Sequence, residues 1–350
     1  MTNQHLVIMA GGIGSRFWPL SDEKTPKQFL DILGTGRTLI QLTLARFEGI
    51  IPIENVWVVT SEEYTDLVRQ QLPEVLPSHI LSEPERRNTA PCICYASWRI
   101  KKENPRANIV VAPSDHIIAD IPAFQACMEG AMEFSAETDA IVTLGIRPTH
   151  PETGYGYIKA DLSYSSSRLH GIFRVDEFTE KPDAERAETF VKTGNYLWNS
   201  GIFIWNVNTI INAFRVYCPK ISQAFERLMP IYGTDKEQAA IKQVYDKLES
   251  ISIDYAILEK AEEVFVCPAN FPWSDLGTWG SLRNQLSTDA YGNAAVGAPT
   301  DFHETHNSIV HTHTLQRVVV QGLDGCIVAE HNGTLLICKL SEEQRIRLFH

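Results

Sequence analysis

Residues His5–Leu30 read HLVIMAGGIGSRFWPLSDEKTPKQFL, and the fold is decided by this stretch. Its apolar run, Leu6–Ala10, is long enough for one buried strand. The chain then turns through Gly11, Gly12 and Gly14, which leave backbone N–H groups uncovered and allow dihedrals that other residues resist. Consecutive uncovered N–H groups form a concave nest for an anion. The stretch therefore predicts a buried strand that leads into an anion-binding turn.

Two cations follow the glycine turn, Arg16 at once and Lys27 in the segment Pro26-Lys27-Gln28-Phe29. Backbone N–H groups can bind phosphate oxygens, Arg can fork onto two of them, and Lys supplies a point charge. The set suits a polyphosphate, and the alternative is a plain glycine turn beside two surface cations. A Walker A loop is excluded because Gly-Lys-Ser/Thr is missing, and a dinucleotide fingerprint is excluded because Phe17 replaces its last glycine.

Apolar strand-like runs alternate with helical stretches through the first two thirds of the chain. The strand-like runs are residues 55–60, 79–81, 108–112 and 140–145, and the helical stretches include 38–48, 89–102, 121–136, 184–193, 208–216, 221–228, 236–248 and 253–262. This alternation predicts an α/β fold, with a Rossmann-like, mostly parallel sheet flanked by helices. Ligands of such sheets bind beyond the carboxyl ends of the strands.

The texture of the sequence changes twice after residue 150. Half-polar runs over residues 157–181 predict an antiparallel extension. After about residue 290, short β-branched runs punctuated by glycine predict a small, β-helix-like domain. We therefore expect a domain over residues 1–288 that carries the glycine turn, and a small C-terminal β domain over residues 289–350.

Composition restricts the class of protein. The 350 residues are 44% hydrophobic and 21% charged, as in soluble globular proteins, and the net charge of −12 disfavours nucleic acid as a partner. The sequence shows no signal-peptide pattern. It also has no apolar run of the roughly 20 residues that a membrane span needs. Seven scattered cysteines without Cys-x-x-Cys are typical of reduced thiols. We expect a cytoplasmic protein that binds neither nucleic acid nor membrane.

Two aspartates are candidate metal ligands. Asp115 follows the predicted strand 108–112, and Asp275 lies in the segment 271–279, FPWSDLGTW. Two carboxylates suit Mg²⁺, which keeps water ligands and takes its remaining ligands from substrate phosphates. The alternative, for each aspartate taken singly, is a loop cap or a turn residue.

The segment 82–91, SEPERRNTAP, is a candidate for base recognition. A carboxylate such as that of Glu83 can accept from both N1–H and the N2 amino group of guanine, whereas adenine and uracil cannot offer this pair. Asn88 and Thr89 stand at the start of the next predicted helix. The alternative is a capped turn with Pro91 in the first helical turn, and both interpretations can hold together.

Three further segments carry side chains that could bind a sugar phosphate. Gly156 lies in the run GYGYI, where backbone N–H groups could approach hydroxyls, or where a hairpin could begin. Glu180 could accept from vicinal hydroxyls and Lys181 could hold a phosphate, unless they form an ordinary surface pair. Asn199 precedes an apolar run, and Asp254 is as compatible with a helix start as with a ligand contact.

Taken in order, these segments resemble the signatures of the sugar-1-phosphate nucleotidyltransferases over roughly residues 5–285, and the runs 11–21 and 26–29 have the form found in the mannose-1-phosphate guanylyltransferases. The resemblance implies catalytic roles for Arg16, Lys27, Asp115 and Asp275, with Mg²⁺ held by Asp115 and Asp275. It implies nucleotide binding by Gly11, Gly12, Gly14, Glu83, Asn88 and Thr89, and sugar-phosphate binding by Gly156, Glu180, Lys181 and Asn199.

The resemblance further implies the partners GTP and mannose 1-phosphate, which would react to GDP-mannose and diphosphate. Two alternatives stay open: a transferase for another NTP or hexose 1-phosphate, and a non-catalytic regulatory subunit of the same fold. Some relatives carry a cupin-type isomerase domain, and the segment after residue 290 is too short for one, so we expect no isomerase activity. Apolar β runs near the C-terminus are compatible with a homodimer.

Two histidine-containing runs invite a metal-site interpretation. The run 303–306, HETH, is one residue short of His-Glu-x-x-His and lies in a β-rich region, whereas that motif requires a helix. The run 311–313, HTH, has no glutamate at the distance that a cupin site would need. We expect neither run to bind a metal.

Overall fold

The computed structural model describes residues 3–12, 14–165 and 171–349, which form two compact units that interleave along the chain. Unit one comprises Met1–Gly11, Leu44–Pro113 and Ile118–Trp273, and unit two comprises Gly12–Thr43, Ser114–Ile117 and Ser274–His350. The chain thus passes from unit one into unit two after Gly11, after Pro113 and after Trp273, and it returns to unit one after Thr43 and after Ile117. This division concerns spatial compactness, so the boundary between domains at residue 288 stays a prediction.

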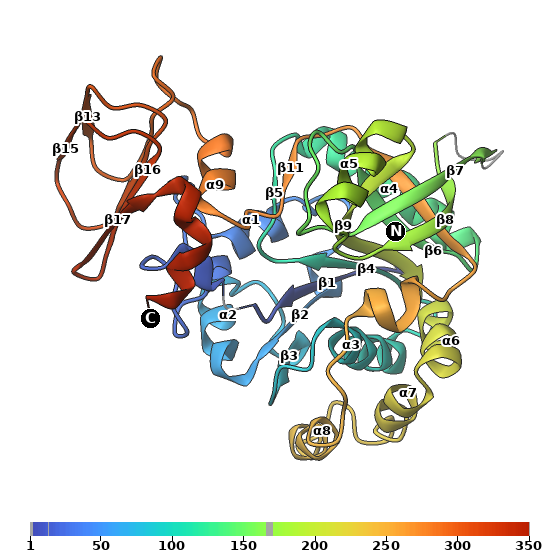
Figure 1. Ribbon diagram of the computed structural model, residues 1–350. Coiled ribbons are helices and arrows are strands. Elements are labelled where there is room, and N and C mark those ends of the chain that lie inside the picture. Colours follow the sequence, from blue (N-terminus) through green and yellow to red (C-terminus); the bar gives the residue numbers. More distant parts are fainter. Residues whose placement is uncertain (1–2, 13, 166–170, 350) are drawn as a thin grey trace. The chain divides into compact units, whose positions relative to one another are not determined.

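Among the described residues, nine strands of unit one form a single sheet with the order β3-β2-β1-β4-β9-β6-β10-β8-β7 (Figure 1). The strands are β1 Gln4–Ala10, β2 Val56–Ser61, β3 Ile80–Glu83, β4 Asn108–Pro113, β6 Ile141–Ile146, β7 Tyr157–Ser165, β8 Phe173–Thr179, β9 Tyr196–Asn206 and β10 Val264–Ala269. Strands β1 to β4 are mutually parallel where they pair. The α/β fold and the antiparallel extension are confirmed.

The central strand β9 was not predicted as part of the sheet. It lies between β4 and β6 and is antiparallel to both. Its apolar half, from Ile202 to Trp205, is buried on both sides as an inner strand requires. The strand therefore places Asn199 inside the sheet rather than on a loop.

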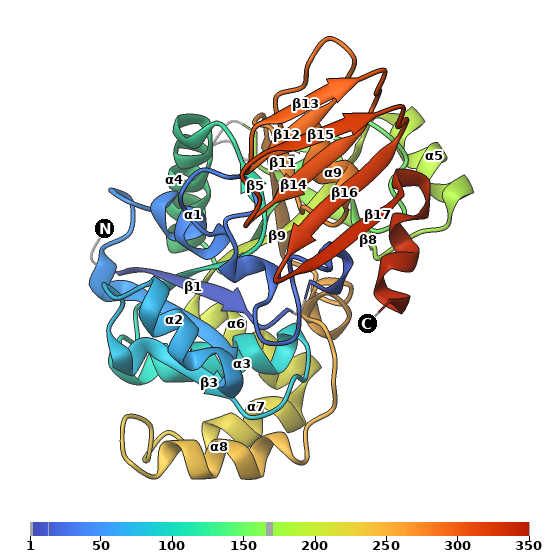
Figure 2. The same cartoon turned by 90° about the vertical axis from the view of Figure 1, so that its left-hand side faces the viewer.

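Helices cover both faces of this sheet: α3, α6, α7 and α8 lie on one face and α4 on the other (Figures 1 and 2). The helices of unit one are α2 Thr65–Gln71, α3 Thr89–Glu103, α4 Ile121–Glu137, α5 Ala184–Thr193, α6 Val207–Tyr217, α7 Pro219–Glu226 and α8 Glu237–Tyr245. The predicted helix over residues 253–262 is reduced to the π-helical turn Asp254–Leu258. None of the described helices is both long enough and apolar enough to cross a membrane.

Unit two contains the C-terminal strands β12 Ala294–Val296, β13 Thr300–His303, β14 Ile309–Thr312, β15 Val318–Gln321, β16 Cys326–His331 and β17 Thr334–Lys339. Strands β12, β14 and β16 pair in parallel, as do β13 and β15, so that each coil of the chain returns beside the last (Figure 2). Parallel ladders between consecutive coils are the geometry of a short β-helix, as predicted. The antiparallel strand β17 completes this sheet.

The segment after the glycine turn belongs to the same hydrophobic core as the C-terminal coils. Phe17 and Leu20 pack in one buried cluster with Trp279, Ile327 and Ile346. Two elements border this core: the helix α9, Trp279–Gln285, and the 3₁₀ segment Leu340–Leu348. Three short elements lie where the chain leaves or enters the unit: α1 Leu39–Ala45, β5 Ile117–Ile118 and β11 Trp273–Ser274. Residues far apart in sequence are thus held in one unit.

Candidate active site

A cavity of about 340 Å³ lies within unit two and brings together the four residues expected to be catalytic. Its lining comprises Gly14, Arg16, Phe17, Lys27, Asp115, His116, Asp275, Gly277 and Arg347. The two cations and the two aspartates come from three separate segments of the chain. Their assembly in one cavity is the arrangement that binding of a polyphosphate and a divalent cation requires.

The glycine turn has a shape that only glycine allows at Gly14. Its φ of +66° lies in the left-handed region, and a Cβ there would come within 2.8 Å of Cγ of Lys27. Ser21 donates its hydroxyl hydrogen to the Gly14 carbonyl, and the Gln28 amide donates to the Gly12 carbonyl at 2.9 Å. Ile13 is outside the described residues. The two motifs at residues 11–21 and 26–29 therefore hold each other in place.

The ammonium of Lys27 uses all three of its donors within unit two. It donates to the carbonyls of Asp275 and Leu276 at 2.9 and 2.8 Å, and it forms an ion pair with Oδ2 of Asp115 at 3.0 Å. Only 7% of the Lys27 side chain is exposed. Lys27 therefore joins the two aspartate-bearing segments, a role that the sequence did not indicate.

The two aspartates are held by neighbouring groups. Burial alone would raise the pKa of Asp115, but the nearby charges of Lys27 and His116 outweigh it and lower this pKa, which favours the ionised form that a metal ligand needs. Oδ1 of Asp275 accepts from the Gly277 N–H at 3.0 Å. A Cβ on Gly277 would lie 2.8 Å from Oδ2 of Asp275, so glycine there leaves room for the carboxylate.

Two guanidinium groups also line the cavity. Arg16 is exposed, and its Nη1 donates to the Gly277 carbonyl at a long 3.4 Å. Arg347 comes from the C-terminal 3₁₀ segment and was missed by the sequence reasoning, because it lies in none of the recognised motifs. No pattern within residues 340–348 indicates that this arginine reaches the glycine turn.

In unit one, Glu83 ends β3 with its carboxyl group buried. Oε1 accepts from the Tyr245 hydroxyl at 2.8 Å, and burial raises the pKa of Glu83 to about 7 although this hydrogen bond acts to lower it. Burial also raises the pKa of Tyr245, so its hydroxyl stays protonated and can donate. The other oxygen, Oε2, faces the start of the glycine turn, because a Cβ on Gly11 would lie 3.9 Å from it.

Asn88 and Thr89 serve the start of α3 in this structure. Asn88, at a φ of +67°, accepts the Thr89 N–H on its side-chain oxygen at 2.8 Å and so caps the helix. The Thr89 hydroxyl accepts from the Ile253 N–H at 2.8 Å. The capped-turn interpretation of this segment is confirmed, and its role in nucleotide binding stays a prediction.

The candidate sugar-phosphate residues gather in unit one. Oε1 of Glu180 pairs with the Lys181 ammonium at 2.6 Å, and a Cβ on Gly156 would come within 2.5 Å of Oε2 of Glu180. The Asn199 amide donates to Oδ1 of Asp254 at 2.9 Å, and burial together with the charge of Glu180 raises the pKa of Asp254 to about 6. Asp254 is therefore part of this cluster, which the sequence left open.

The orientation of the Asn199 side chain is fixed from both ends. Its oxygen accepts from the hydroxyl of Thr143 and from the N–H of Gly201, each at 3.2 Å. Its nitrogen donates one of two hydrogens to Asp254. The second N–H is then held in a defined direction.

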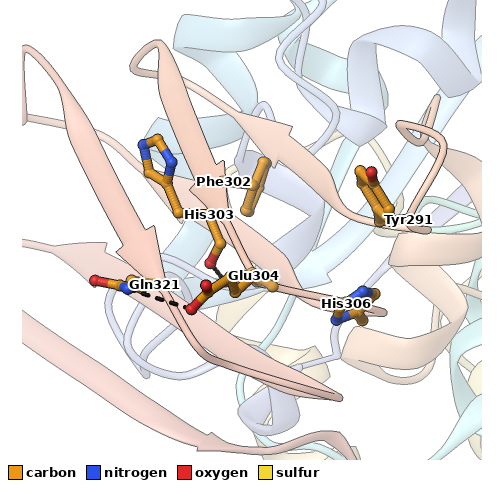
Figure 3. A pocket seen from close by; sticks show the side chains of 7 residues that line it. Tyr291, Phe302, His303, Glu304, His306 and Gln321 are labelled. Atoms are coloured by element: carbon orange, nitrogen blue, oxygen red, sulfur yellow. Dashed lines mark hydrogen bonds between the residues drawn. The ribbon is translucent and has the colours of Figure 1, made fainter.

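A second hollow, of about 740 Å³, lies on the C-terminal coils around residues 302–306 (Figure 3). The side chains of His303 and His306 lie at opposite ends of it, and Gln321 donates to the Glu304 carboxylate at 3.3 Å. Among the described residues, no group of three or more His, Cys, Asp or Glu side chains could hold a metal ion by itself. The histidine, glutamate and glutamine side chains that line this hollow differ from the arginines, lysine and aspartates that line the cavity at Lys27.

Paired aspartates beside arginine, lysine and a glycine turn are residue types that suit phosphate groups and a divalent cation. The sequence profile of the nucleotidyl transferase family matches residues 5–290, and the chain belongs to this family. It is therefore a nucleotidyltransferase.

Several relatives are similar over nearly the whole chain. The mannose-1-phosphate guanylyltransferase of Escherichia coli K12 is 35% identical over 96% of this chain and 72% of its own length. The enzyme of the same name from Sinorhizobium fredii is 37% identical over 97% of this chain and 65% of its own length. A crystal structure described as mannose-1-phosphate geranyltransferase from Thermus thermophilus has a TM-score of 0.88 and 31% identity, and covers 99% of this chain and 98% of its own.

Proposed function

We propose that this chain is a guanylyltransferase that joins GTP and α-mannose 1-phosphate to form GDP-mannose and diphosphate. The observation that carries the proposal is the cavity in which Arg16, Lys27, Asp115 and Asp275 meet. The relatives named mannose-1-phosphate guanylyltransferase support the choice of substrates.

The chemistry that we propose needs charge neutralisation rather than a general base. A phosphate monoester has its second pKa near 6, so the sugar phosphate is ionised at neutral pH and is already a nucleophile. One of its oxygens attacks the α-phosphorus of GTP in line, and the bond from this phosphorus to the bridging β-phosphate oxygen breaks. Two anions must be brought together, which cations and backbone N–H groups make favourable.

The residues of unit two suit the triphosphate. Arg16 and the N–H groups of the glycine turn would hold its oxygens. Among the described residues, a Cβ on Gly12 would meet no atom within 4 Å, so the space beside Gly12 is open to the close approach of a ligand. Lys27 would reach a phosphate by exchanging one of its three present bonds, and it otherwise positions both aspartates.

The donor set in the cavity fits Mg²⁺. Two carboxylates, held by Lys27 and by the Gly277 N–H, offer the few oxygen ligands that Mg²⁺ takes from a protein when phosphates and water complete its shell. Asp115 and Asp275 would hold the ion. When bound, it supplies charge neutralisation for the triphosphate and for the departing diphosphate.

Unit one would recognise the base and the sugar phosphate. An ionised Glu83 can accept from guanine N1–H and from its amino group, and Gly11, Asn88 and Thr89 are the neighbouring nucleotide-binding residues in this proposal. Glu180 and the second N–H of Asn199 would bind hydroxyls, with Gly156 leaving the space that Glu180 occupies. Lys181, whose side chain is 62% exposed, would hold the phosphate of the sugar.

The decisive experiment measures pyrophosphate release from each of the four NTPs, with mannose 1-phosphate or glucose 1-phosphate and Mg²⁺. We expect GTP with mannose 1-phosphate to give the highest kcat/KM. A higher value with another pair would establish the alternative of a different nucleotide or hexose. No release with any pair would leave the regulatory subunit as the explanation.

The role of Glu83 is tested by Glu83→Gln with GTP and with ITP, which lacks the N2 amino group. The wild type should prefer GTP, because a carboxylate accepts from both guanine donors. The amide keeps the shape but presents one acceptor, so the variant should lose most of the GTP preference, about 10-fold. An unchanged ratio of kcat/KM for GTP and ITP would exclude Glu83 as the guanine-reading residue.

A further inference from the structure

The C-terminal 3₁₀ segment Leu340–Leu348 is anchored beside the glycine turn at three points. Ile346 is completely buried in the core cluster that contains Phe17. The rings of Phe349 and Trp18 contact each other edge to face, with centroids 6.5 Å apart. Glu343 accepts the Gly280 N–H at 2.8 Å. Figure 1 shows this red segment beside the blue segment that follows β1. Arg347 is therefore held between two anchored residues, Ile346 and Phe349.

Arg347 lines the cavity, and its side chain is exposed. Within the residues that the structure describes, it has no ion pair and no hydrogen bond. Of the other two cations that line the cavity, Lys27 is committed to Asp115 and two carbonyls, and Arg16 makes one long hydrogen bond, at 3.4 Å, to the Gly277 carbonyl. Arg345, on the same segment but not in the cavity lining, pairs with Glu342 at 2.8 Å. Arg347 thus adds a positive charge without a protein partner, among the described residues, to the cavity that Arg16 and Lys27 also line.

We propose that Arg347 binds the terminal phosphates of the nucleotide substrate and the diphosphate that is released, a role that rests on the proposed function. A guanidinium can fork onto two phosphate oxygens. Asp115 and Asp275 offset the charge of a divalent ion that they hold, so the net charge of a triphosphate, about −4, exceeds what Arg16 and Lys27 neutralise. The family profile ends at residue 290. The 3₁₀ segment Leu340–Leu348 would thus contribute a binding residue to the site that this profile does not contain.

The test compares Arg347→Gln with Arg345→Gln, a matched control on the same segment. Binding of inorganic pyrophosphate, GTP and GDP-mannose is measured by isothermal titration calorimetry in metal-free buffer. We expect Arg347→Gln to weaken binding of pyrophosphate and GTP about 10-fold or more, because charge-assisted hydrogen bonds are lost. Binding of GDP-mannose, which lacks the departing phosphates, should change less than about twofold. Arg345→Gln should leave all three affinities unchanged.

In steady-state assays, Arg347→Gln should raise KM for GTP and leave KM for mannose 1-phosphate unchanged, and Arg347→Lys should recover part of the loss. If Arg347→Gln bound pyrophosphate within about twofold of the wild-type affinity, the proposal would be overturned. An equal loss of affinity in Arg345→Gln would also overturn it, because the loss would then reflect only the overall charge of the protein. Wild-type chain that releases no pyrophosphate with any NTP would refute the proposed function instead, and calorimetry with pyrophosphate would still measure the anion site.

Discussion

The hydroxyl of Tyr245 donates to Oε1 of Glu83 over 2.8 Å, although 162 residues separate the two in sequence. Both side chains are buried, and the carboxyl group therefore has a pKa of about 7 instead of 4.5. A tyrosine hydroxyl that donates a hydrogen bond to a carboxyl group stabilises the ionised form of that group. Tyr245 thereby helps to keep Glu83 in the form that can accept two hydrogen bonds from guanine.

Tyr245→Phe should shift the pH dependence of GTP use. Without the hydroxyl, the pKa of Glu83 rises further, by about one unit if the hydrogen bond contributes about 1.4 kcal/mol. The midpoint of kcat/KM for GTP against pH, about 7 in the wild type, should move upward by the same amount. At pH 7 the loss should be about fivefold, and it should shrink toward about pH 8.5.

Tyr95→Phe is the matched control for this shift. Tyr95 lies in the same core cluster, and its hydroxyl donates to Glu237 at 2.8 Å rather than to Glu83. This variant loses a partly buried hydrogen bond of the same length but should keep the wild-type midpoint. Equal midpoints in wild type and Tyr245→Phe would show that Glu83 does not control GTP use through its ionisation.

Glu83→Gln should stabilise the fold at high pH. The folded pKa of Glu83, about 7, lies above the value of 4.5 for the free group, so the folded chain binds this proton more tightly than the unfolded chain does. The favourable contribution is complete below pH 4.5 and is lost as pH rises to about 7. The amide avoids the burial of a charge, so the variant should gain about 3 kcal/mol in free energy of unfolding at about pH 8.

Urea unfolding at two pH values checks this gain. At about pH 5, where most of the folded chain carries a neutral Glu83, the difference between variant and wild type should fall below about 1 kcal/mol. A variant that is equally or less stable at the higher pH would mean that the carboxyl group is not buried in the charged form there.

The sequence predicted the α/β fold and the β-helix because both depend on local patterns. Continuous apolar runs between helical stretches specify a covered parallel sheet, and short β-branched runs with glycine specify coils. The centre of the sheet was harder to predict. Strand β9 runs antiparallel to both of its neighbours, β4 and β6, and the order of strands depends on long-range pairing. The π-helical turn at Asp254 likewise has no sequence signature separate from that of an α-helix.

The site residues could be named from motifs, whereas their contacts could not. Lys27 was expected to face a phosphate, and its bonds to the carbonyls of residues 275 and 276 follow from packing between segments 248 and 249 residues apart. Arg347 and Tyr245 reach their places from elements outside every motif. Residues that act across such distances leave no periodic pattern in one sequence.

Gly277→Ala should weaken activation by Mg²⁺. The added Cβ would stand 2.8 Å from Oδ2 of Asp275 and displace this proposed ligand. The Mg²⁺ concentration for half-maximal activity should rise about 10-fold, as for other losses of groups that orient a metal ligand. Gly280→Ala is the control, because its Cβ would meet no atom closer than 3.5 Å. An unchanged Mg²⁺ requirement in Gly277→Ala would argue against Asp275 as a ligand.

Gly156→Ala should act on the sugar phosphate alone. Its Cβ would lie 2.5 Å from Oε2 of Glu180 and 3.3 Å from the Phe178 ring, so the carboxylate must move. We expect KM for mannose 1-phosphate to rise about 10-fold, the cost of one lost hydrogen bond to a charged group, with KM for GTP unchanged. The matched control is Gly130→Ala in α4, where a Cβ meets nothing within 4 Å and helix propensity improves. If both variants raised KM for mannose 1-phosphate equally, or if Gly156→Ala raised only KM for GTP, Glu180 would not be a sugar-binding residue, because the closest contact of the added methyl group is with its carboxylate, whereas Cβ of Asn199 lies at 3.4 Å.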